Sequence, residues 1–168
     1  MNENDKLVLF LLGFIPKSDL SDWFDEYIAN HEVDEIPVDF FEWHVNGEYG
    51  FYPIRDYLKS QYADFSENSV YVETILARYL LSFIQKYMEN DLSECEFCYQ
   101  FAKIEAHFLN HYPKITEKNV IYYPDWLKGL YDACDWCAEK DWHADEKADF
   151  RHDLWLAQKS IETWLQTA

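Results

Sequence analysis

The sequence predicts an all-α fold, a single-domain antiparallel helical bundle of about seven to eight helices, and three observations support this prediction. Apolar residues recur at helical spacing through most of the 168 residues. Only four Gly and five Pro interrupt the chain. A content of 49% hydrophobic and 19% aromatic residues supplies a core and excludes a disordered chain. Because no repeat or Pro/Gly/Ser-rich linker marks a boundary, we expect one domain, with an acidic helical part at 1–65 and a four-helix part at 66–168.

The first expected element is a buried helix around the apolar run from Leu7 to Ile15. This run resembles the centre of a secretory signal, but Glu3 and Asp5 outweigh Lys6 before it, and no small-residue cleavage site follows it. At nine residues it is also shorter than the roughly 20 apolar residues that span a bilayer. We therefore expect a cytoplasmic protein.

The next elements lie between residues 18 and 53. Ser18 or Asp19 can cap an amphipathic helix. Its apolar stripe contains Leu20, Trp23, Phe24, Tyr27 and Ile28. In residues 37–53 two interpretations compete. Asn46-Gly47 between aromatic and β-branched residues is typical of a short β-hairpin near 40–52, whereas Pro37 at a first helical position and Gly47 as a C-terminal cap indicate a helix, which we favour.

The second half of the chain predicts four antiparallel helices that bury their apolar stripes against one another. The longest begins at Ser66 or Ser69 and continues to Asn90. The second begins with a capping box of Ser93 and Glu96 and stops at Pro113. The third begins near Pro124-Asp125, and the last extends from about Ala144 to Leu165. The inward face of the third helix contains Leu127, Leu130, Tyr131, Cys134 and Cys137.

The charge of the chain restricts the class of partner. With 32 acidic against 14 basic residues, the formal net charge is -18. Such a chain repels a phosphate backbone and an anionic membrane surface, so we expect neither direct nucleic-acid binding nor membrane binding. Complementary fields accelerate the association of an acidic protein with a basic one. A cationic protein is therefore the expected partner.

The acidic residues are concentrated in two stretches. Residues 18–54 contain ten carboxylates and no Lys or Arg, and a second stretch from Asp132 to Asp153 is diluted by three basic residues. Aromatic residues interleave with the acids, as they do in protein-binding surfaces; the alternative is that these are ordinary solvated helix faces. The predicted partner-binding residues are Asp22, Asp25, Glu26, Glu32, Asp34, Glu35, Asp39, Glu42, Trp23, Trp43, Asp141, Asp145, Glu146 and Asp149.

Two C-x-x-C pairs are the strongest chemical motif. Cys95 and Cys98 form the first pair, and Cys134 and Cys137 form the second; four thiolates so paired could hold zinc tetrahedrally. Both pairs lie on predicted apolar stripes, and neighbouring acidic residues oppose thiolate formation. We therefore interpret the cysteines as core residues and expect no cofactor or metal. A zinc-dependent enzyme and a redox site remain alternatives.

Other catalytic patterns are missing from the sequence. His107 and His111 have metal-ligand spacing, but no H-E-x-x-H motif accompanies them. The remaining histidines have no recognisable nucleophile partner, and no glycine-rich phosphate loop occurs. We therefore predict no catalytic residue and do not expect an enzyme.

One region resembles a known family. The residues Leu80-Leu81-Ser82-Phe83-Ile84 through Asp91-Leu92-Ser93-Glu94-Cys95-Glu96-Phe97, with the later segment from Tyr123-Pro124-Asp125-Trp126-Leu127 to Cys134, resemble colicin-D-type bacterial immunity proteins. The resemblance covers residues 76–166 at most and leaves the first 70 residues unexplained.

That resemblance implies a small acidic bundle that takes part in bacterial competition. Such a protein binds and neutralises a cognate tRNA-cleaving toxin, and its carboxylates cover the basic surface that would hold RNA phosphates. The expected function is thus that of an immunity protein acting as a toxin inhibitor through protein–protein interaction. An alternative that also rests on an acidic surface is a nucleic-acid mimic that inhibits a DNA-binding protein. Neither interpretation predicts the oligomeric state.

Overall fold

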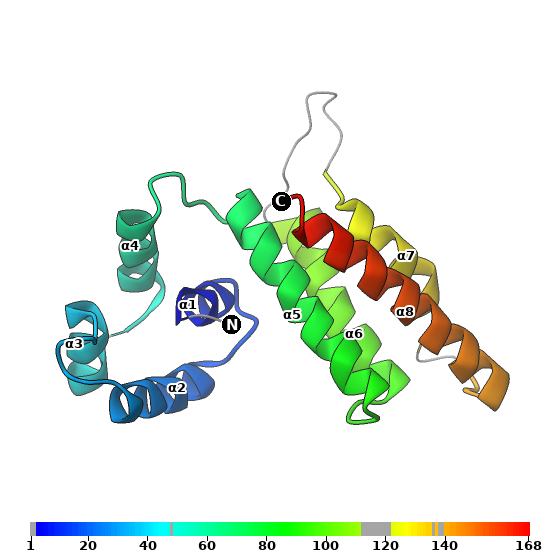
Figure 1. Ribbon diagram of the computed structural model, residues 1–168, viewed down its shortest axis with the longest axis horizontal. Helices are drawn as coiled ribbons and strands as arrows, with labels where there is room; N and C mark the ends of the chain where they lie inside the picture. The colour runs from blue at the N-terminus through cyan, green and yellow to red at the C-terminus, as the bar shows by residue number, and fades with distance from the viewer. Residues whose placement is uncertain (1–2, 48, 112–121, 136, 138–139) are drawn as a thin grey trace. The chain divides into compact units, whose positions relative to one another are not determined.

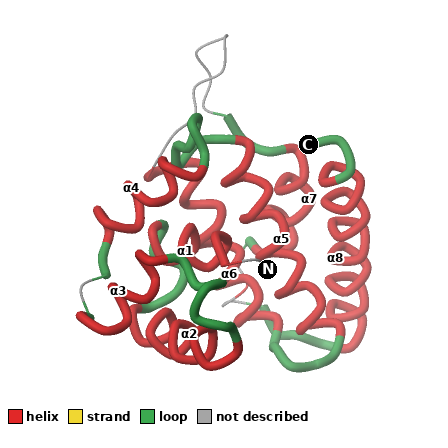
Figure 2. Tube along the Cα trace, turned by 60° about the vertical axis from the view of Figure 1, so that its left-hand side comes forward, coloured by secondary structure: helices red, strands yellow, loops and turns green. Residues whose placement is uncertain are grey.

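The computed structural model describes residues 3–47, 49–111, 122–135, 137 and 140–168, and all regular secondary structure in these ranges is helical (Figures 1 and 2). The predicted all-α fold is therefore confirmed. The elements are α1 (Glu3–Leu11), α2 (Lys17–Asn30), α3 (Val38–Asn46), α4 (Phe51–Gln61), α5 (Val70–Met88), α6 (Glu94–Ala106), a π-helical turn η1 (His107–His111), α7 (Asp125–Cys134) and α8 (Ala144–Leu165).

The chain divides into two compact units, residues 1–72 and 73–168, so that the division falls in the first turn of α5. This division lies a few residues after the sequence-based one between 65 and 66. The first unit contains α1 to α4, and the second contains nearly all of α5 together with α6, η1, α7 and α8. Each unit has its own buried residues and is described by itself.

Helix α1 is part of the core of the first unit. Leu7, Val8 and Leu9 are fully buried, as the sequence predicted for a buried helix. Helix α1 packs against α2 and α4. Among the described helices, none combines the length and the apolar character that a bilayer-crossing helix requires.

Residues 38–46 form helix α3, so the hairpin alternative is wrong. Pro37 is the N-cap, and its carbonyl accepts hydrogen bonds from the Phe40 and Phe41 N–H groups. Gly47 ends the helix with a φ of 64°, in the left-handed region where glycine has no steric penalty. The cap glycine was thus the correct signal, and the Asn46-Gly47 turn signal was misleading.

The core of the first unit is a cluster of aromatic rings. Phe24 of α2 lies with its ring centroid 5.5 Å from that of Phe40 of α3, which in turn lies 5.2 Å from Tyr57 of α4. Trp43 lies 5.7 Å from Phe40. These offset and edge-to-face contacts connect three helices, so α3 is held to its neighbours through its inward face.

The second unit contains the four predicted helices α5 to α8, drawn from green to red in Figure 1. Ser69 caps α5, since its Oγ accepts the Val72 N–H at 3.4 Å. Both hydrogen bonds of the predicted capping box of Ser93 and Glu96 are present at the start of α6. Helix α8 follows the predicted limits and packs along α7. The aromatic contact between Tyr87 and Phe150, at 5.3 Å, joins α8 to α5.

Two details of the second unit differ from the sequence prediction. Helix α5 ends at Met88, because Asn90 adopts a left-handed φ of 66° that cannot continue a helix. Helix α7 ends at Cys134, so Cys137 is not on its inward face, and Tyr131 is half exposed. Residues 112–121, including the predicted stop at Pro113, lie outside the described residues.

Candidate functional site

The predicted carboxylates of the first unit lie on α2, on α3 and on the segment between them. All eight of these side chains are exposed. They are Asp22, Asp25, Glu26, Glu32, Asp34, Glu35, Asp39 and Glu42. The inward residues of α2, Leu20 and Phe24, are fully buried, so the amphipathic pattern of the sequence places the carboxylates toward solvent.

These carboxylates are hardly neutralised by the chain itself. In the described parts of the first unit, the one ion pair that any of the eight makes joins Asp25 Oδ1 of α2 to His44 Nδ1 of α3, at 3.2 Å. Glu35 forms only a weak local hydrogen bond with the Glu32 N–H, at 3.4 Å. The segment 18–54 itself contains no Lys or Arg. The base that precedes it, Lys17, lies over the Tyr49 ring with its Nζ 4.7 Å from the ring centroid.

Helix α3 also exposes a row of apolar side chains, which we name the α3 face. It consists of Val38, Phe41 and Val45, which are 72%, 46% and 63% exposed. The spacing of three and four residues places them on one side of the helix, opposite the buried Phe40 and Trp43. An apolar row beside unbalanced carboxylates is a suitable surface for a partner that is both apolar and cationic.

Of the two predicted tryptophan anchors, Trp43 is positioned differently from the prediction, whereas Trp23 keeps part of its surface exposed. Trp43 is only 8% exposed and stacks on Phe40, so it belongs to the core and is not available to a partner. Trp23 is partly buried, with its ring 4.9 Å from Phe24 and 5.3 Å from Tyr27. The sequence prediction missed the α3 face, although its members lie opposite the core residues on a helical wheel.

The second predicted acidic stretch has a mixed charge. Asp141, Asp145, Glu146 and Asp149 are exposed. Glu146, however, accepts the His143 N–H at 2.9 Å and so caps α8. Basic side chains of Lys140, Lys147 and Arg151 interleave with these acids. The structure therefore places the two predicted acidic groups in different units, and only the group of the first unit is free of basic neighbours in sequence.

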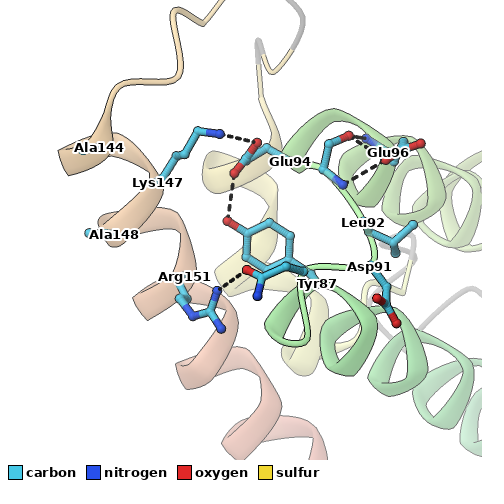
Figure 3. Close-up of a pocket in the computed structure, with 11 residues that line it drawn as sticks. Tyr87, Asp91, Leu92, Glu94, Glu96, Ala144, Lys147, Ala148 and Arg151 are labelled. Atoms are coloured by element: carbon cyan, nitrogen blue, oxygen red, sulfur yellow. Dashed lines mark hydrogen bonds and ion pairs between the residues drawn. The ribbon is translucent and has the colours of Figure 1, made fainter.

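A cavity of about 510 Å³ lies between the α5–α6 turn and the start of α8 (Figure 3). Glu94 is central there: it accepts hydrogen bonds from the Tyr87 hydroxyl at 3.1 Å and from Lys147 Nζ at 3.3 Å. Burial and the hydrogen bond to Glu94 raise the pKa of Tyr87 to about 12. Burial tends to raise the pKa of Glu94, but its hydrogen bonds outweigh burial and lower it. These groups stabilise the unit rather than form an activated acid–base pair.

The second cation at this cavity is also engaged. Arg151 donates to the Met88 carbonyl and to Asn90 Oδ1, the latter at 3.4 Å. It therefore holds the turn that follows α5. Neither Lys147 nor Arg151 is an unoccupied anion-binding group.

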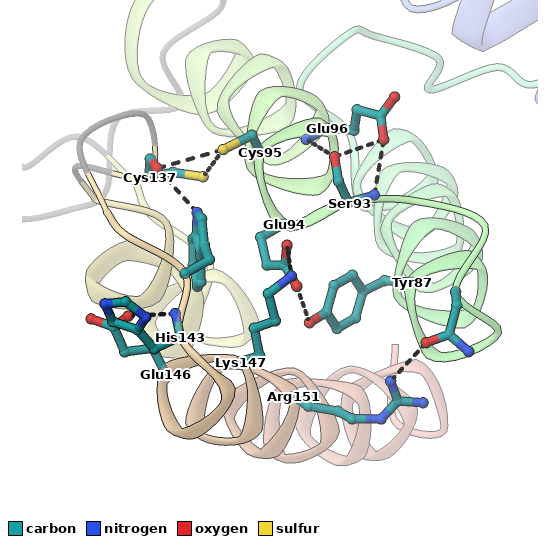
Figure 4. A network of polar contacts seen from close by, with 12 residues as sticks. Tyr87, Ser93, Glu94, Cys95, Glu96, Cys137, His143, Glu146, Lys147 and Arg151 are labelled. Atoms are coloured by element: carbon teal, nitrogen blue, oxygen red, sulfur yellow. Dashed lines mark hydrogen bonds and ion pairs between the residues drawn. The ribbon is translucent and has the colours of Figure 1, made fainter.

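One cysteine of each C-x-x-C pair, Cys95 at the start of α6 and Cys137, lie against each other (Figure 4). Cys137 Sγ lies 3.1 Å from Cys95 Sγ. The hydrogen bond to Cys134 together with burial raises the pKa of Cys98. Burial likewise raises the pKa of Cys137. Cys98 and Cys137 therefore lack the low pKa of a catalytic or redox-active cysteine.

The structure describes the side chain of only one of the two histidines that have metal-ligand spacing. His107 is buried, whereas the side chain of His111 lies outside what the structure describes.

Comparison with family models gave no match, and neither a curated protein nor a solved structure matches the chain.

Proposed function

We propose that this protein binds a cationic protein through the α3 face and the carboxylates around it, and that the partner is a nuclease toxin which it neutralises. The observation that carries the proposal is the exposed apolar row of Val38, Phe41 and Val45 in a segment of ten carboxylates without Lys or Arg. The proposal places the protein in the cytoplasm, where a toxin that cleaves RNA would act.

The two components of the surface have different physical roles. The carboxylates create a long-range potential that accelerates the approach of a basic partner, and this effect weakens as salt screens it. The apolar row supplies the contact that excludes water once the two proteins meet, and this contact mainly sets the dissociation rate. Fast, salt-sensitive association and slow dissociation are expected together.

Neutralisation requires no chemistry in this mechanism. A nuclease holds its substrate with Lys and Arg side chains that contact phosphates. Carboxylates such as Asp22, Glu26 and Glu42 would occupy those cations and exclude the nucleic acid. The resemblance of residues 76–166 to colicin-D-type immunity proteins agrees with this role, but the acidic surface itself lies in residues that the resemblance does not cover.

The test uses the polypeptide encoded by the open reading frame directly upstream, which in an immunity system is the toxin. We expect that polypeptide to arrest growth and cleave RNA, and this protein to restore growth and bind it in purified form. An upstream product that is not toxic, or a toxic one that this protein does not bind, would contradict the proposal.

Two sets of variants locate the surface. Charge reversal at Asp22, Glu26 and Glu42 should slow association at least tenfold at low salt, and Phe41→Ala with Val45→Ala should accelerate dissociation. The matched control reverses Asp145 and Asp149 of the second unit and should leave both rates within about twofold. Equal effects of the two charge reversals would mean that net charge, and not this surface, determines binding.

A further inference from the structure

The four cysteines have no part in the proposed function. They are free thiols, and all of them belong to the second unit. Among the residues that the structure describes, no group of three or more His, Cys, Asp or Glu side chains could hold a metal ion. The arrangement therefore offers a pair of thiols and not a set of metal ligands.

Two of the thiols lie against each other although they are far apart in the sequence. The Sγ atoms of Cys95 and Cys137 are 3.1 Å apart, and 42 residues separate the two positions. Cys95 lies in the first turn of α6, and Cys137 lies in the connection between α7 and α8. A disulfide bond is about 2.05 Å long, so the two sulfurs need to approach by only about 1 Å. Rotation of the side chains can supply such a movement.

Hydrogen bonds hold the two chain segments in place around this contact. The Cys137 carbonyl accepts a hydrogen bond from Cys95 Sγ at 3.5 Å, from the Trp142 indole N–H at 3.3 Å and from the Lys140 N–H at 3.4 Å (Figure 4). The Ser93 capping box fixes the start of α6. Because the two thiols are already positioned, a bond between them costs little conformational entropy in the folded chain.

The two thiols differ in their access to solvent. Cys95 is exposed, whereas Cys137 is only 8% exposed. A small oxidant in solution therefore meets Cys95 first. Cys137, which no oxidant reaches as easily, lies where it can react with the modified Cys95.

We propose that Cys95 and Cys137 form a reversible disulfide cross-link when the protein meets an oxidised low-molecular-weight thiol such as glutathione disulfide. The Cys95 sulfur attacks one sulfur of that disulfide, so a mixed disulfide forms and one glutathione leaves with the Cys95 proton. The Cys137 sulfur then attacks Cys95 Sγ. The bond to the second glutathione breaks, and this glutathione leaves with the Cys137 proton. Two protein thiols are thus oxidised, and one glutathione disulfide is reduced to two thiols.

The cross-link is a clamp and not a catalytic redox centre. Catalytic disulfides are strong oxidants when a low thiol pKa stabilises their reduced form, whereas burial raises the pKa of Cys137. The bond would join the start of α6 to the segment before α8. Closing a loop across 42 residues restricts the unfolded chain, so the oxidised protein should be the more stable form. The acidic surface of the proposed function lies in the other unit, so the cross-link is independent of it.

The experiment uses the full chain, purified under reducing conditions and then equilibrated with oxidised and reduced glutathione. After alkylation of the remaining thiols, a protease that cleaves after acidic residues cuts each C-x-x-C pair between its cysteines, at Glu96 and at Asp135. Mass spectrometry should find the peptide of Cys95 linked to that of Cys137. The midpoint of thermal unfolding should be roughly 5–15 °C higher for the oxidised than for the reduced protein. A cross-link that leaves this midpoint unchanged would refute the clamp.

Two variants locate the bond. Cys95→Ser replaces an exposed thiol, so the fold should tolerate it, and both the linked peptides and the shift of the midpoint should disappear. The matched control, Cys134→Ser, removes a cysteine of the other pair but leaves both sulfurs of the cross-link, so it should keep the link and the shift. The map of linked peptides from the unaltered protein gives the answer if a variant fails to fold.

Four other results would each overturn the proposal. These are four alkylated thiols after oxidation, a chain that stops at the mixed disulfide on Cys95, a disulfide within either C-x-x-C pair, and a disulfide between two chains.

Discussion

The two units use their carboxylates differently. The first has 15 acidic and four basic residues, a formal net charge of −11, and the second has 17 acidic and ten basic residues, a net charge of −7. In the second unit three carboxylates each accept a hydrogen bond from a tyrosine hydroxyl. These pairs are Glu94 with Tyr87 at 3.1 Å, Glu73 with Tyr122 at 2.7 Å and Glu105 with Tyr123 at 2.9 Å. The carboxylates of α2 and α3 are instead exposed.

Carboxylates in these two settings have opposite effects on the stability of the fold. A buried carboxylate with hydrogen-bond partners contributes to the fold, and its loss leaves those partners unsatisfied. An exposed carboxylate among like charges contributes repulsion, which destabilises the compact state. The exposed carboxylates of the first unit therefore do not stabilise the fold, and the proposed function assigns them to partner binding instead.

The largest effect on the free energy of unfolding is expected on α3, where one side of the helix is packed in the core and the other is exposed. Phe40→Ala should destabilise the protein by about 3–5 kcal/mol, because it leaves a cavity in the aromatic core of the first unit. Its neighbour Phe41 is the matched control, and Phe41→Ala should change the free energy of unfolding by less than about 0.5 kcal/mol. Denaturant unfolding followed by circular dichroism measures both. Similar losses for the two variants would mean that the α3 face is part of the fold.

A smaller effect on the free energy of unfolding is expected when one carboxylate of each unit is neutralised. Glu94→Gln removes the charge that Lys147 pairs with and weakens the bond from Tyr87, so we expect a loss of about 1.5–3 kcal/mol. Glu26→Gln, on the exposed side of α2, should change the stability by less than about 0.5 kcal/mol or increase it slightly. The same unfolding measurement applies. A large loss for Glu26→Gln would remove the contrast between the units.

The smallest effect concerns the dependence of stability on pH. The folded pKa of Glu94 lies below its ordinary value of 4.5, because its hydrogen bonds to its own backbone N–H, to Tyr87 and to Lys147 outweigh burial. The ionised form is thus favoured in the folded state, and its contribution is present above pH 4.5 and is lost as the pH falls through the folded pKa. The stability difference between the unaltered protein and Glu94→Gln should shrink below pH 4.5. Thermal unfolding across acidic pH measures this, and a difference independent of pH would refute the assigned role of Glu94.

Much of the helical architecture could be predicted because its signals are local. The Ser93 capping box, the Gly47 cap and the limits of α8 all depend on residues a few positions apart. The orientation of α3 could not be predicted, since both of its faces are apolar and the sequence period alone does not indicate which one is buried. Trp43 was therefore assigned to the surface, and Phe41 was missed.

The contact between Cys95 and Cys137 could not be predicted from local sequence patterns either. The spacing within each C-x-x-C pair is visible in the sequence, but the contact between Cys95 and Cys137 depends on how α6 and α7 pack. The end of α7 at Cys134 was decisive, because it releases Cys137 from the helix so that its side chain can reach Cys95. The partners of Glu94 likewise come from α5 and α8 and leave no pattern in the sequence.

Helix α8 has a consequence for the order in which the chain folds during translation. It supplies Lys147 to Glu94, and it supplies Arg151 to the turn after α5. The second unit therefore obtains these contacts only after the ribosome has released residues 144–165. The ring contacts of Phe24 with Phe40 and of Phe40 with Tyr57 join residues within 1–72, so we expect them to form while the rest of the chain is still being synthesised.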